Sequence, residues 1–317
     1  KMKFTLKNII LLNIIFLLNS FASSASFSEW IKNLEKEVKN IGISEQVYNN
    51  TLGHIKEVNK KVLKLYDNQP EFKITFDDYY NRNINLKRIE LGKSLLKKHK
   101  KILQEIYLKY KVPPRIIVSI WGIETNYGSY MGNFNVIEAL ATLAYASKRK
   151  KFFKKELINS LLIYEKYYKN SDKIMMGSWA GAMGQSQFMP SSFINYAVDY
   201  DNDGLIDIWN SKKDVFASIA NYLKQHGWKE KIHWCNEIKL KEKIDKDGYY
   251  NVSILSDIRK LNNHKNSKKI NIKIIKNNPY KRFFSINENF HTIKKYNNSD
   301  YYALIIGVLA NKIEYED

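Results

Sequence analysis

Residues 117–128 read Ile117-Val118-Ser119-Ile120-Trp121-Gly122-Ile123-Glu124-Thr125-Asn126-Tyr127-Gly128. Apolar side chains fill almost every position before the glutamate, and a helix that is apolar nearly all round belongs in a core. At helical spacing, Ile117, Ile120 and Trp121 lie on the same stripe as Glu124. The stretch therefore predicts a buried helix with a carboxyl group near its end.

The Glu124 carboxyl is the first candidate for chemistry. Burying a carboxylate costs free energy unless the group is paired, protonated or used. Next to the Trp121 indole the group should be desolvated, which favours the protonated acid that general acid catalysis near neutral pH requires. The alternative is a structural glutamate that pairs with an arginine or a lysine.

The first 25 residues have the three parts of a secretory signal peptide. A basic head is followed by an apolar run, and residues 20–25 offer small side chains for cleavage after Ala22 or Ala25. The run is too short for a comfortable membrane span, although an uncleaved anchor is the alternative. No cysteine lies near the cleavage region, which excludes a lipid-modified N-terminus. The sequence thus predicts an exported, soluble, periplasmic protein.

The bulk composition is that of a globular chain. Its 317 residues suffice for two or three domains, with 44% hydrophobic and 26% charged residues. The net charge of +20 falls to +17 when residues 1–25 and their three lysines are removed. Such a charge permits nucleic acid, an anionic membrane or another anionic polymer as a partner. Lysine, asparagine and isoleucine are abundant throughout, however, which favours compositional bias over a dedicated basic site. Cys235 is the only cysteine, so an internal disulfide is excluded.

Helical patterns cover most of the chain. One long helix is expected over residues 85–110, and Pro114 fits the first turn of the next helix. Weak alternation at residues 239–241 and 271–274 indicates strands in an α+β insert. The predicted segments are a signal peptide (1–25), an N-terminal helical region (26–115), a catalytic core (116–228), a small α+β insert (229–285) and a helical C-terminal segment that returns to the core (286–317).

The acidic loop 199–214 matches the first half of a calcium-binding loop. Aspartates stand at positions one, three and five, Gly204 stands at position six for the sharp turn, and Asp207 at position nine. Asn210 at position twelve cannot supply the usual bidentate carboxylate. Asp214 could close the loop a turn later, and it is also the expected N-cap of the following helix. Five aspartates within sixteen residues of a basic chain favour a bound cation; the alternative is a solvated acidic turn.

Small, aromatic and amide-bearing residues crowd the loop 177–190, which favours close passage of a ligand. Amides that contact hydroxyls and aromatic rings that lie under sugar C–H groups bind saccharides in this way. The alternative is a structural turn packed by its own aromatic residues. The candidate contacts are Ser178, Gln185 and Gln187 for hydrogen bonds, and Trp179 and Phe188 for stacking.

Several motifs occur together along the chain. They are Ile120-Trp121-Gly122-Ile123-Glu124-Thr125 with Tyr127-Gly128, Ala139-Leu140-Ala141-Thr142-Leu143-Ala144-Tyr145, and Gly181-Ala182-Met183-Gly184 with Gln187-Phe188-Met189-Pro190-Ser191-Ser192. With the acidic loop, Asn221-Tyr222 and Tyr296-Asn297-Asn298-Ser299, they span nearly all of residues 27–313. In this combination the chain resembles the lytic murein transglycosylase B family.

The resemblance implies a mainly α fold, with a goose-lysozyme-like helical core, an N-terminal helical region and a small β-containing insert. It implies cleavage of peptidoglycan glycan strands between N-acetylmuramic acid and N-acetylglucosamine, with Glu124 as the catalytic acid/base. It places saccharide contacts at Ser178, Gln187, Tyr222, Tyr296, Tyr127 and Asn297, and a structural Ca²⁺ or Na⁺ at Asp199, Asp201, Asp203, Asp214 and the Leu205 carbonyl.

A single carboxyl group suffices for this reaction if the substrate supplies the nucleophile, whereas ordinary glycosidases use two carboxylates. Glu124 would protonate the leaving glycosidic oxygen. As a carboxylate it would then accept the proton of the muramic C6 hydroxyl while a 1,6-anhydro ring closes. No cofactor takes part in this chemistry. We expect a monomer that acts on peptidoglycan, alone or together with other cell-wall enzymes.

Three other functions stay open at this point. A muramidase would use water and leave a reducing sugar instead of an anhydro sugar. A non-catalytic wall-binding protein is favoured if Glu124 pairs with a cationic side chain. A nucleic-acid binder would show a DNA affinity that falls steeply with salt, but the export signal disfavours it.

Overall fold

The apolar stretch around Trp121 forms helix α8 (Pro114–Thr125) in the computed structural model of the protein. Pro114 occupies the first turn, where no N–H is needed and the ring already fixes a helical φ. All residues from Ile116 to Gly122 are buried, which confirms the predicted core helix. Four helices pack around α8, namely α6 (Leu86–Lys98), α7 (Lys100–Tyr110), α12 (Lys212–Gln225) and α14 (Asp300–Lys312).

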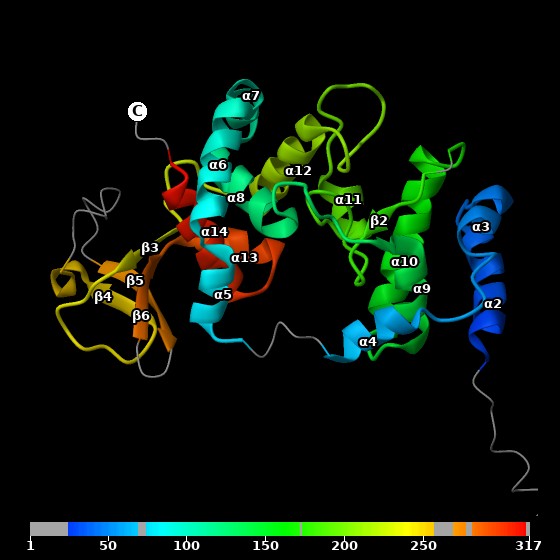
Figure 1. The fold of residues 1–317 in the computed structure, drawn as a ribbon, viewed down its shortest axis with the longest axis horizontal. Helices are drawn as coiled ribbons and strands as arrows, with labels where there is room; N and C mark the ends of the chain where they lie inside the picture. Colours follow the sequence, from blue (N-terminus) through cyan, green and yellow to red (C-terminus); the bar gives the residue numbers. More distant parts are fainter. Residues whose placement is uncertain (1–24, 69–73, 172, 257–268, 277–280, 315–317) are drawn as a thin grey trace, which may run out of the picture.

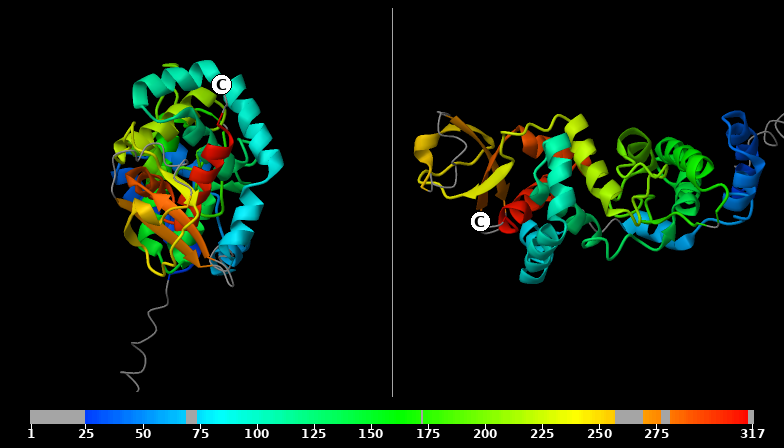
Figure 2. Two further views of the ribbon diagram at one scale, coloured as in Figure 1. Left: turned by 90° about the vertical axis from the view of Figure 1, so that its left-hand side faces the viewer. Right: turned by 90° about the horizontal axis from the view of Figure 1, so that it is seen from above.

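The structure describes residues 25–68, 74–171, 173–256, 269–276 and 281–314. The molecule is elongated, with α2 (Phe27–Asn40) and α3 (Glu45–Thr51) at one end and a four-stranded sheet at the other (Figure 1), as the view from above also shows (Figure 2). The predicted signal peptide lies outside the described residues, apart from Ala25. Within the described ranges, no helix combines the length and the hydrophobicity needed to cross a bilayer.

The predicted long helix over residues 85–110 is in fact two helices. α6 ends at Lys98, α7 begins at Lys100, and His99 between them is not helical. The His99 ring packs edge-on against Trp121 and Phe216, with centroid distances of 6.0 and 5.3 Å. The bend thus places this half-buried ring against the core. Periodicity could not predict it, because neither glycine nor proline marks the break.

A second group of helices extends the core toward α2 and α3. α9 (Val136–Ala146) and α10 (Lys150–Tyr167) pack on each other, and α4 (Lys60–Asn68) packs on α9. One hydrophobic cluster runs from Phe27 to Ile313 through all of these helices. The predicted domain boundaries at 115/116, 228/229 and 285/286 stay predictions. The remaining elements of this half are α11 (Pro190–Tyr196) and the short antiparallel pair β1 (Phe134–Asn135) and β2 (Met176–Gly177).

The predicted α+β insert forms an antiparallel sheet with the strand order β3-β6-β5-β4. In β5, Ile270, Ile272 and Ile274 are buried and alternate with half-buried polar residues, as the sequence pattern predicts. The predicted strand at residues 239–241 is displaced, because β3 already ends at Ile238 and only Leu240 forms an isolated bridge. The strands are β3 (Cys235–Ile238), β4 (Gly248–Asn251), β5 (Lys269–Lys276) and β6 (Lys281–Ile286).

Arg282 of β6 fastens the sheet to α5 (Phe76–Asn83). Its guanidinium donates to both Glu237 carboxylate oxygens at 2.8 and 2.9 Å and to Asp77 of α5 at 3.2 Å. It also lies over the Tyr80 ring, 4.1 Å from the centroid. A planar guanidinium suits this combination of a bidentate carboxylate and an aromatic face. The insert is therefore held against the helical core rather than merely tethered to it.

The helical C-terminal segment consists of α13 (Glu288–Tyr296) and α14, separated by the turn Asn297-Asn298-Ser299. Ser299 caps α14 by accepting the Tyr302 N–H at 3.3 Å. Every residue from Tyr302 to Ala310 is buried, because α14 packs against α8, α13, α5 and β3. Because α14 has neighbours on several sides, it has almost no polar face.

Gly307→Ala should destabilise the fold by about 1–3 kcal/mol, because it overpacks a filled core. A Cβ at this position would meet the Cys235 sulfur and would lie 2.7 Å from Trp234 Cδ1. Chemical unfolding of the variant measures the loss. Lys312→Ala, an exposed change on the same helix, is the control and should stay within about 0.5 kcal/mol of wild type; equal stability of both variants would contradict the packing described here.

Candidate active site

Glu124 is the second-to-last residue of α8, and the backbone that follows it is unusual. Asn126, Tyr127 and Gly128 have φ values of 48°, 60° and 80°, all in the left-handed region. Asn126 ends the helix by donating its N–H to the Trp121 carbonyl. Non-glycine residues are uncommon in this region, and such strain concentrates at functional sites. The carboxyl is thus carried on a turn of fixed shape.

The Glu124 carboxyl is half-buried and accepts a hydrogen bond from the Tyr302 hydroxyl. The two oxygens are 2.6 Å apart, a distance typical of a hydroxyl that donates to a carboxylate. Tyr302 is only 2% exposed. Burial, and then the negative charge of Glu124, raise its pKa well above that of free tyrosine. The hydroxyl therefore keeps its proton and stays a donor to the carboxyl.

The Trp121 indole, which was expected to desolvate the carboxyl, packs against His99, Tyr127 and Phe216. Two tyrosines of the C-terminal segment lie beside the carboxyl. Tyr296 lies close enough for the Glu124 charge to add to the effect of burial on its pKa, which is also raised. Glu124 is half-buried beside this tyrosine pair, and the desolvation of its carboxyl by the indole stays a prediction.

Aromatic rings from three segments continue from Tyr302. The Tyr296 ring is nearly parallel to it, with centroids 6.4 Å apart. Tyr222 of α12 and Phe188 of the loop 177–190 contact Tyr296 at centroid distances of 4.8 and 5.7 Å. Rings at such distances pack favourably and exclude water. Two of the predicted saccharide residues, Tyr222 and Tyr296, are thus brought together, and Tyr296 lies close to Glu124.

The hydroxyls of these two tyrosines are bonded to the backbone. Tyr296 donates to the Ser186 carbonyl at 2.6 Å, and Tyr222 donates to the Lys295 carbonyl at 2.6 Å. These bonds connect the loop 177–190, α12 and α13. Both side chains consequently have fixed orientations, and their contacts with saccharide stay predictions.

Gln185 ties the loop to α8. Its side-chain oxygen accepts from Trp121 Nε1 at 2.9 Å and from Lys212 Nζ at 2.8 Å. Its backbone carbonyl accepts from the Thr125 hydroxyl at 3.1 Å. Gln185 is only 2% exposed, and its side-chain oxygen is already bonded to two other side chains. Its predicted role as a saccharide contact is therefore wrong. The side chain instead fixes the loop next to the end of α8.

Ser178 and Gln187 are both half-buried on this loop. Ser178 Oγ accepts the backbone N–H groups of Ala180 and Ala182 at 3.3 and 3.0 Å, and its own proton remains available for donation. Gln187 donates its side-chain amide to the Met131 carbonyl at 3.0 Å, which leaves its Oε1 as an acceptor. The arrangement is compatible with saccharide binding, which stays a prediction for both residues.

The acidic loop gathers three of its carboxylates. Oxygen atoms of Asp199, Asp201 and Asp203 all lie within 4.8 Å of one another. Gly204 adopts a φ of 90° and donates its N–H to Asp199 at 2.9 Å, which forms the sharp turn that the pattern predicts. Within the described residues, the buried Oδ1 of Asp201 has no hydrogen-bond partner. The ligand role of the Leu205 carbonyl stays a prediction.

Asp214 is fully buried and lies at the base of this loop. It accepts the backbone N–H groups of Tyr200 and Asp207, each at 2.8 Å. Burial, and to a smaller extent the charges of Asp201 and Asp199, raise the pKa of Asp214 against the opposing effect of these bonds. The prediction that Asp214 is the N-cap of α12 is wrong. Ser211 is the N-cap, and Asp214 follows in the first turn. Its role as a metal ligand stays a prediction.

Comparison with protein families accounts for almost the whole described chain. The family described as the Transglycosylase SLT domain matches residues 26–311. The chain belongs to this transglycosylase family. Membrane-bound lytic murein transglycosylase B of Escherichia coli (strain K12) is 30% identical over 314 residues, which cover 92% of this chain and 84% of that protein. The resemblance found in the sequence motifs is thereby confirmed.

Solved structures of related transglycosylases agree with the fold. SltB3 from Pseudomonas aeruginosa in complex with NAG-NAM-pentapeptide has a TM-score of 0.80 and 32% identity, covering 92% of this chain and 80% of that chain. The Escherichia coli lytic transglycosylase Slt35 in complex with calcium has a TM-score of 0.75 and 28% identity, covering 93% and 94%. The predicted fold class, a mainly helical lysozyme-like core with a small β-containing insert, is confirmed.

Two other residues predicted to bind saccharide in this transglycosylase lie differently. Tyr127 is 7% exposed, and its hydroxyl donates to the Arg88 carbonyl at 2.8 Å. Its ring packs so tightly on Gly122 that a Cβ there would lie 2.7 Å from Tyr127 Cζ. Tyr127 therefore supports the turn after Glu124 from behind. Asn297 is exposed in the turn after α13. Saccharide contacts of both residues stay predictions.

Tyr302 is the site residue of this transglycosylase that the sequence did not reveal. It lies in an otherwise apolar helix, and a tyrosine buried in such a helix needs a partner for its hydroxyl. That signal was present in the sequence. Only the fold shows that the partner is a carboxyl 178 residues earlier.

Stability should fall as the pH rises above about 10, the usual pKa of tyrosine. Burial raises the pKa of Tyr222 to about 12 and that of Tyr296 well above its usual value. Above about pH 10 the unfolded chain loses these protons while the folded chain keeps them. The free energy of unfolding contributed by these tyrosines is fully present below that pH. Above it, this free energy falls by about 1.4 kcal/mol per pH unit for each such tyrosine.

Urea unfolding near about pH 8 and about pH 11 measures this loss, on either side of the usual tyrosine pKa. Tyr222→Phe should show a smaller fall than wild type. Tyr249→Phe, which changes a side chain that is 73% exposed, should behave like wild type. Identical falls for all three proteins would show that the buried tyrosines do not cause the effect.

Proposed function

We propose that the protein is a lytic transglycosylase that cleaves the MurNAc–GlcNAc β-1,4 bond of peptidoglycan and forms 1,6-anhydro-muramic acid ends, with Glu124 as its single acid/base. The observation that carries this proposal is the hydrogen bond from Tyr302 to the half-buried Glu124 carboxyl. Membership of the transglycosylase family and the murein transglycosylase relative support the substrate class. The NAG-NAM-pentapeptide bound to SltB3 supports it as well.

In the first step Glu124 acts as a general acid. Because Tyr302 donates to Oε1, the carboxyl proton resides on Oε2. From there it passes to the glycosidic oxygen while the bond from that oxygen to C1 of muramic acid breaks. The acetamido oxygen of the same sugar supports the positive charge that develops at C1. The leaving N-acetylglucosamine departs with a free hydroxyl.

In the second step the Glu124 carboxylate acts as a general base. It accepts the proton of the muramic C6 hydroxyl while O6 bonds to C1, which closes the anhydro ring and restores the acid. Between the two steps, the Tyr302 hydroxyl stabilises the carboxylate. The wall formed by Tyr296 and Tyr222 keeps water from C1, which favours ring closure over hydrolysis.

The Tyr302 hydroxyl beside Glu124 supports the proposed acid, because a neutral donor stabilises the carboxylate without holding it permanently as an anion. The Tyr302 hydroxyl, with its raised pKa, donates without becoming charged. The proposed reaction uses only groups that belong to the protein and to the substrate, and it needs no cofactor. We place the enzyme in the periplasm as a monomer, directed there by residues 1–25.

The acidic loop is proposed to hold a structural Ca²⁺, with Na⁺ as the alternative. Asp199, Asp201 and Asp203 supply oxygen atoms, and the buried Oδ1 of Asp201 is the atom most in need of a partner. Hard oxygen ligands are those that Ca²⁺ prefers. A cation there would also offset the repulsion that these charges exert on Asp214. The calcium in the Slt35 structure supports this proposal.

Glu124→Gln should lower the release of anhydro-muropeptides from purified cell wall by about 10²–10⁴-fold, because it removes the transferable proton. Mass spectrometry of the released fragments measures the product. Glu90→Gln, an exposed change on α6, is the control and should retain wild-type activity. Undiminished anhydro product from the Glu124 variant would refute the assignment.

Tyr302→Phe should lower kcat by about 10- to 100-fold with little change in KM, because it removes a hydrogen bond to the carboxylate. The limb of the pH–rate profile that reports ionisation of the catalytic acid should move to higher pH, since the carboxylate loses a donor. Tyr107→Phe, which loses a surface hydroxyl on α7, should leave the profile unchanged. A lower kcat with an unshifted profile would mean that Tyr302 only supports the fold.

Saturating calcium should stabilise the protein by about 2–3 kcal/mol at 100 times its Kd. The double variant Asp201→Ala/Asp203→Ala should lose this gain. Glu57→Ala/Glu242→Ala removes the same charge from exposed positions outside the loop and should keep it. Thermal unfolding with calcium and with chelator measures the difference. A gain that survives in the loop variant would place the cation elsewhere.

A further inference from the structure

A pocket of about 300 Å³ lies at the insert, where the start of β5 meets the turn 229–233 and the start of α13. Its floor crosses three strands, because the strand register sets Asn271 of β5 between Tyr249 of β4 and Ile286 of β6. Concave sites of this size can hold a small ligand or part of a larger one. Neither the chemistry proposed for Glu124 nor the predicted saccharide contacts use these residues.

The side chains around this pocket are basic. Lys231 and Lys269 stand exposed at its edge, and within the ranges that the structure describes neither ammonium forms an ion pair. His233 and His291 add two imidazole groups to the lining. The acidic side chain among the described lining residues, Glu288, is already paired with a neighbouring lysine. The pocket therefore offers a ligand positive charge and N–H donors.

Two contacts give the pocket a fixed shape. The fully buried Asn289 accepts the Lys229 N–H at 2.9 Å and donates to the Lys229 carbonyl at 2.8 Å. These bonds hold the turn that carries Lys231 against α13. The His233 ring stacks on Trp234, with ring centroids 4.3 Å apart. A ligand thus meets basic groups on a backbone that is already ordered, which lowers the entropy cost of binding.

The chemistry of the lining favours a phosphoryl group as the ligand. Ammonium groups bind phosphate as point charges, and N–H donors add charge-assisted hydrogen bonds to its oxygen atoms. A metal ion is disfavoured, because among the described residues the ligating side chains gather in threes only at Asp199, Asp201 and Asp203. The pocket therefore suits an anion with several oxygen atoms.

Two large apolar side chains form an exposed rim beside the lysines. Tyr249 is 73% exposed and Ile232 is 37% exposed, and both line the pocket. Tyrosine next to lysine is typical of protein surfaces that meet lipid headgroups, because the ring enters the interface while the ammonium lies near the anionic lipids. A phosphate free in solution makes no use of such a rim. The combination favours a phosphate that belongs to a lipid.

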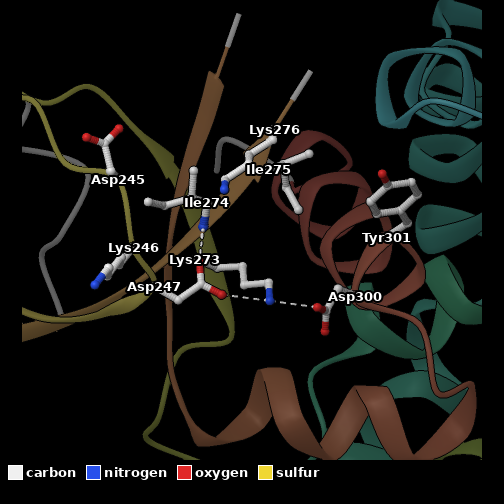
Figure 3. A pocket seen from close by; sticks show the side chains of 9 residues that line it. All are labelled: Asp245, Lys246, Asp247, Lys273, Ile274, Ile275, Lys276, Asp300 and Tyr301. Carbon is white, nitrogen blue, oxygen red and sulfur yellow. Dashed lines mark hydrogen bonds and ion pairs between the residues drawn. The ribbon is translucent and has the colours of Figure 1, made fainter. Parts of the chain in front are cut away.

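The insert cannot move independently of the helical core, so binding at the insert orients the whole molecule. Lys273 of β5 pairs with Asp247 of the insert at 2.9 Å and with Asp300 of α14 at 2.7 Å (Figure 3). Arg282 adds the contacts to α5 described above. The insert forms one end of the elongated molecule, and the helices around α8 extend away from it (Figure 1).

We propose that this pocket binds the phosphate of an anionic phospholipid, so that the insert rests on a membrane surface and the helical core extends away from it. Lys231 and Lys269 pair with headgroup phosphates, and the two histidines of the lining donate N–H groups. Ile232 and Tyr249 enter the interface. This attachment is reversible and does not involve residues 1–25. A site for free inorganic phosphate is the rival outcome of the test.

The test is cosedimentation with vesicles of pure phosphatidylglycerol, with protein purified after export. Wild type should bind, and Lys231→Ala/Lys269→Ala should bind roughly 30-fold more weakly, at about fivefold for each lysine near an anionic lipid surface. Lys239→Ala/Lys241→Ala removes the same charge from exposed positions of the insert outside the pocket and should bind like wild type. Absence of wild-type binding, or equal losses in the two double variants, would overturn the proposal.

Two further measurements separate the lipid from free phosphate. Vesicles of pure phosphatidylcholine, whose headgroups carry no net charge, should not bind wild type; binding equal to that of phosphatidylglycerol would count against the site. Ile232→Ser/Tyr249→Ser keeps both lysines but loses the apolar rim, so it should bind phosphatidylglycerol vesicles roughly tenfold more weakly. If this rim variant bound the vesicles like wild type, and calorimetry showed inorganic phosphate binding that only Lys231→Ala/Lys269→Ala loses, the lipid assignment would be wrong.

Discussion

The proposed catalytic geometry depends on one hydrogen bond, from the buried Tyr302 hydroxyl to the Glu124 carboxyl at 2.6 Å. A carboxyl partly withdrawn from water needs a donor that keeps its proton, and the raised pKa of Tyr302 provides such a donor. The bond joins α8 to α14, which come from the middle and the end of the chain. Folding of the C-terminal segment is therefore a condition for a correctly oriented acid.

The rest of the core holds the end of α8 in place. Gln185 binds it through Trp121 and Thr125, and Tyr127 packs behind it with its hydroxyl on the Arg88 carbonyl. The left-handed backbone that follows Glu124 is tolerated because these contacts hold it. A rigid support of this kind would keep the carboxyl in position for both proposed proton transfers without reorganisation during the reaction.

The sequence predicted those features that depend on local pattern. The core helix around Trp121, the acidic turn at Gly204 and the alternation in β5 follow directly from periodicity and turn chemistry. The bend at His99 did not, because it goes with the packing of the His99 ring on Phe216, a contact between distant segments. The same holds for Gln185, whose polar side chain suggested a sugar contact although it bonds to buried groups. The role of Tyr302 depends on how α14 packs on α8, which no local pattern encodes.

The central claim is that the substrate attacks itself while one carboxyl group first gives and then recovers a proton. Digestion of purified cell wall in water enriched in ¹⁸O, followed by mass spectrometry of the sugar ends, tests it most directly. The account predicts muramic ends that lack one water and carry no ¹⁸O from the first turnover onward. Muramic ends that are reducing and labelled with ¹⁸O would show that water is the nucleophile and would contradict it.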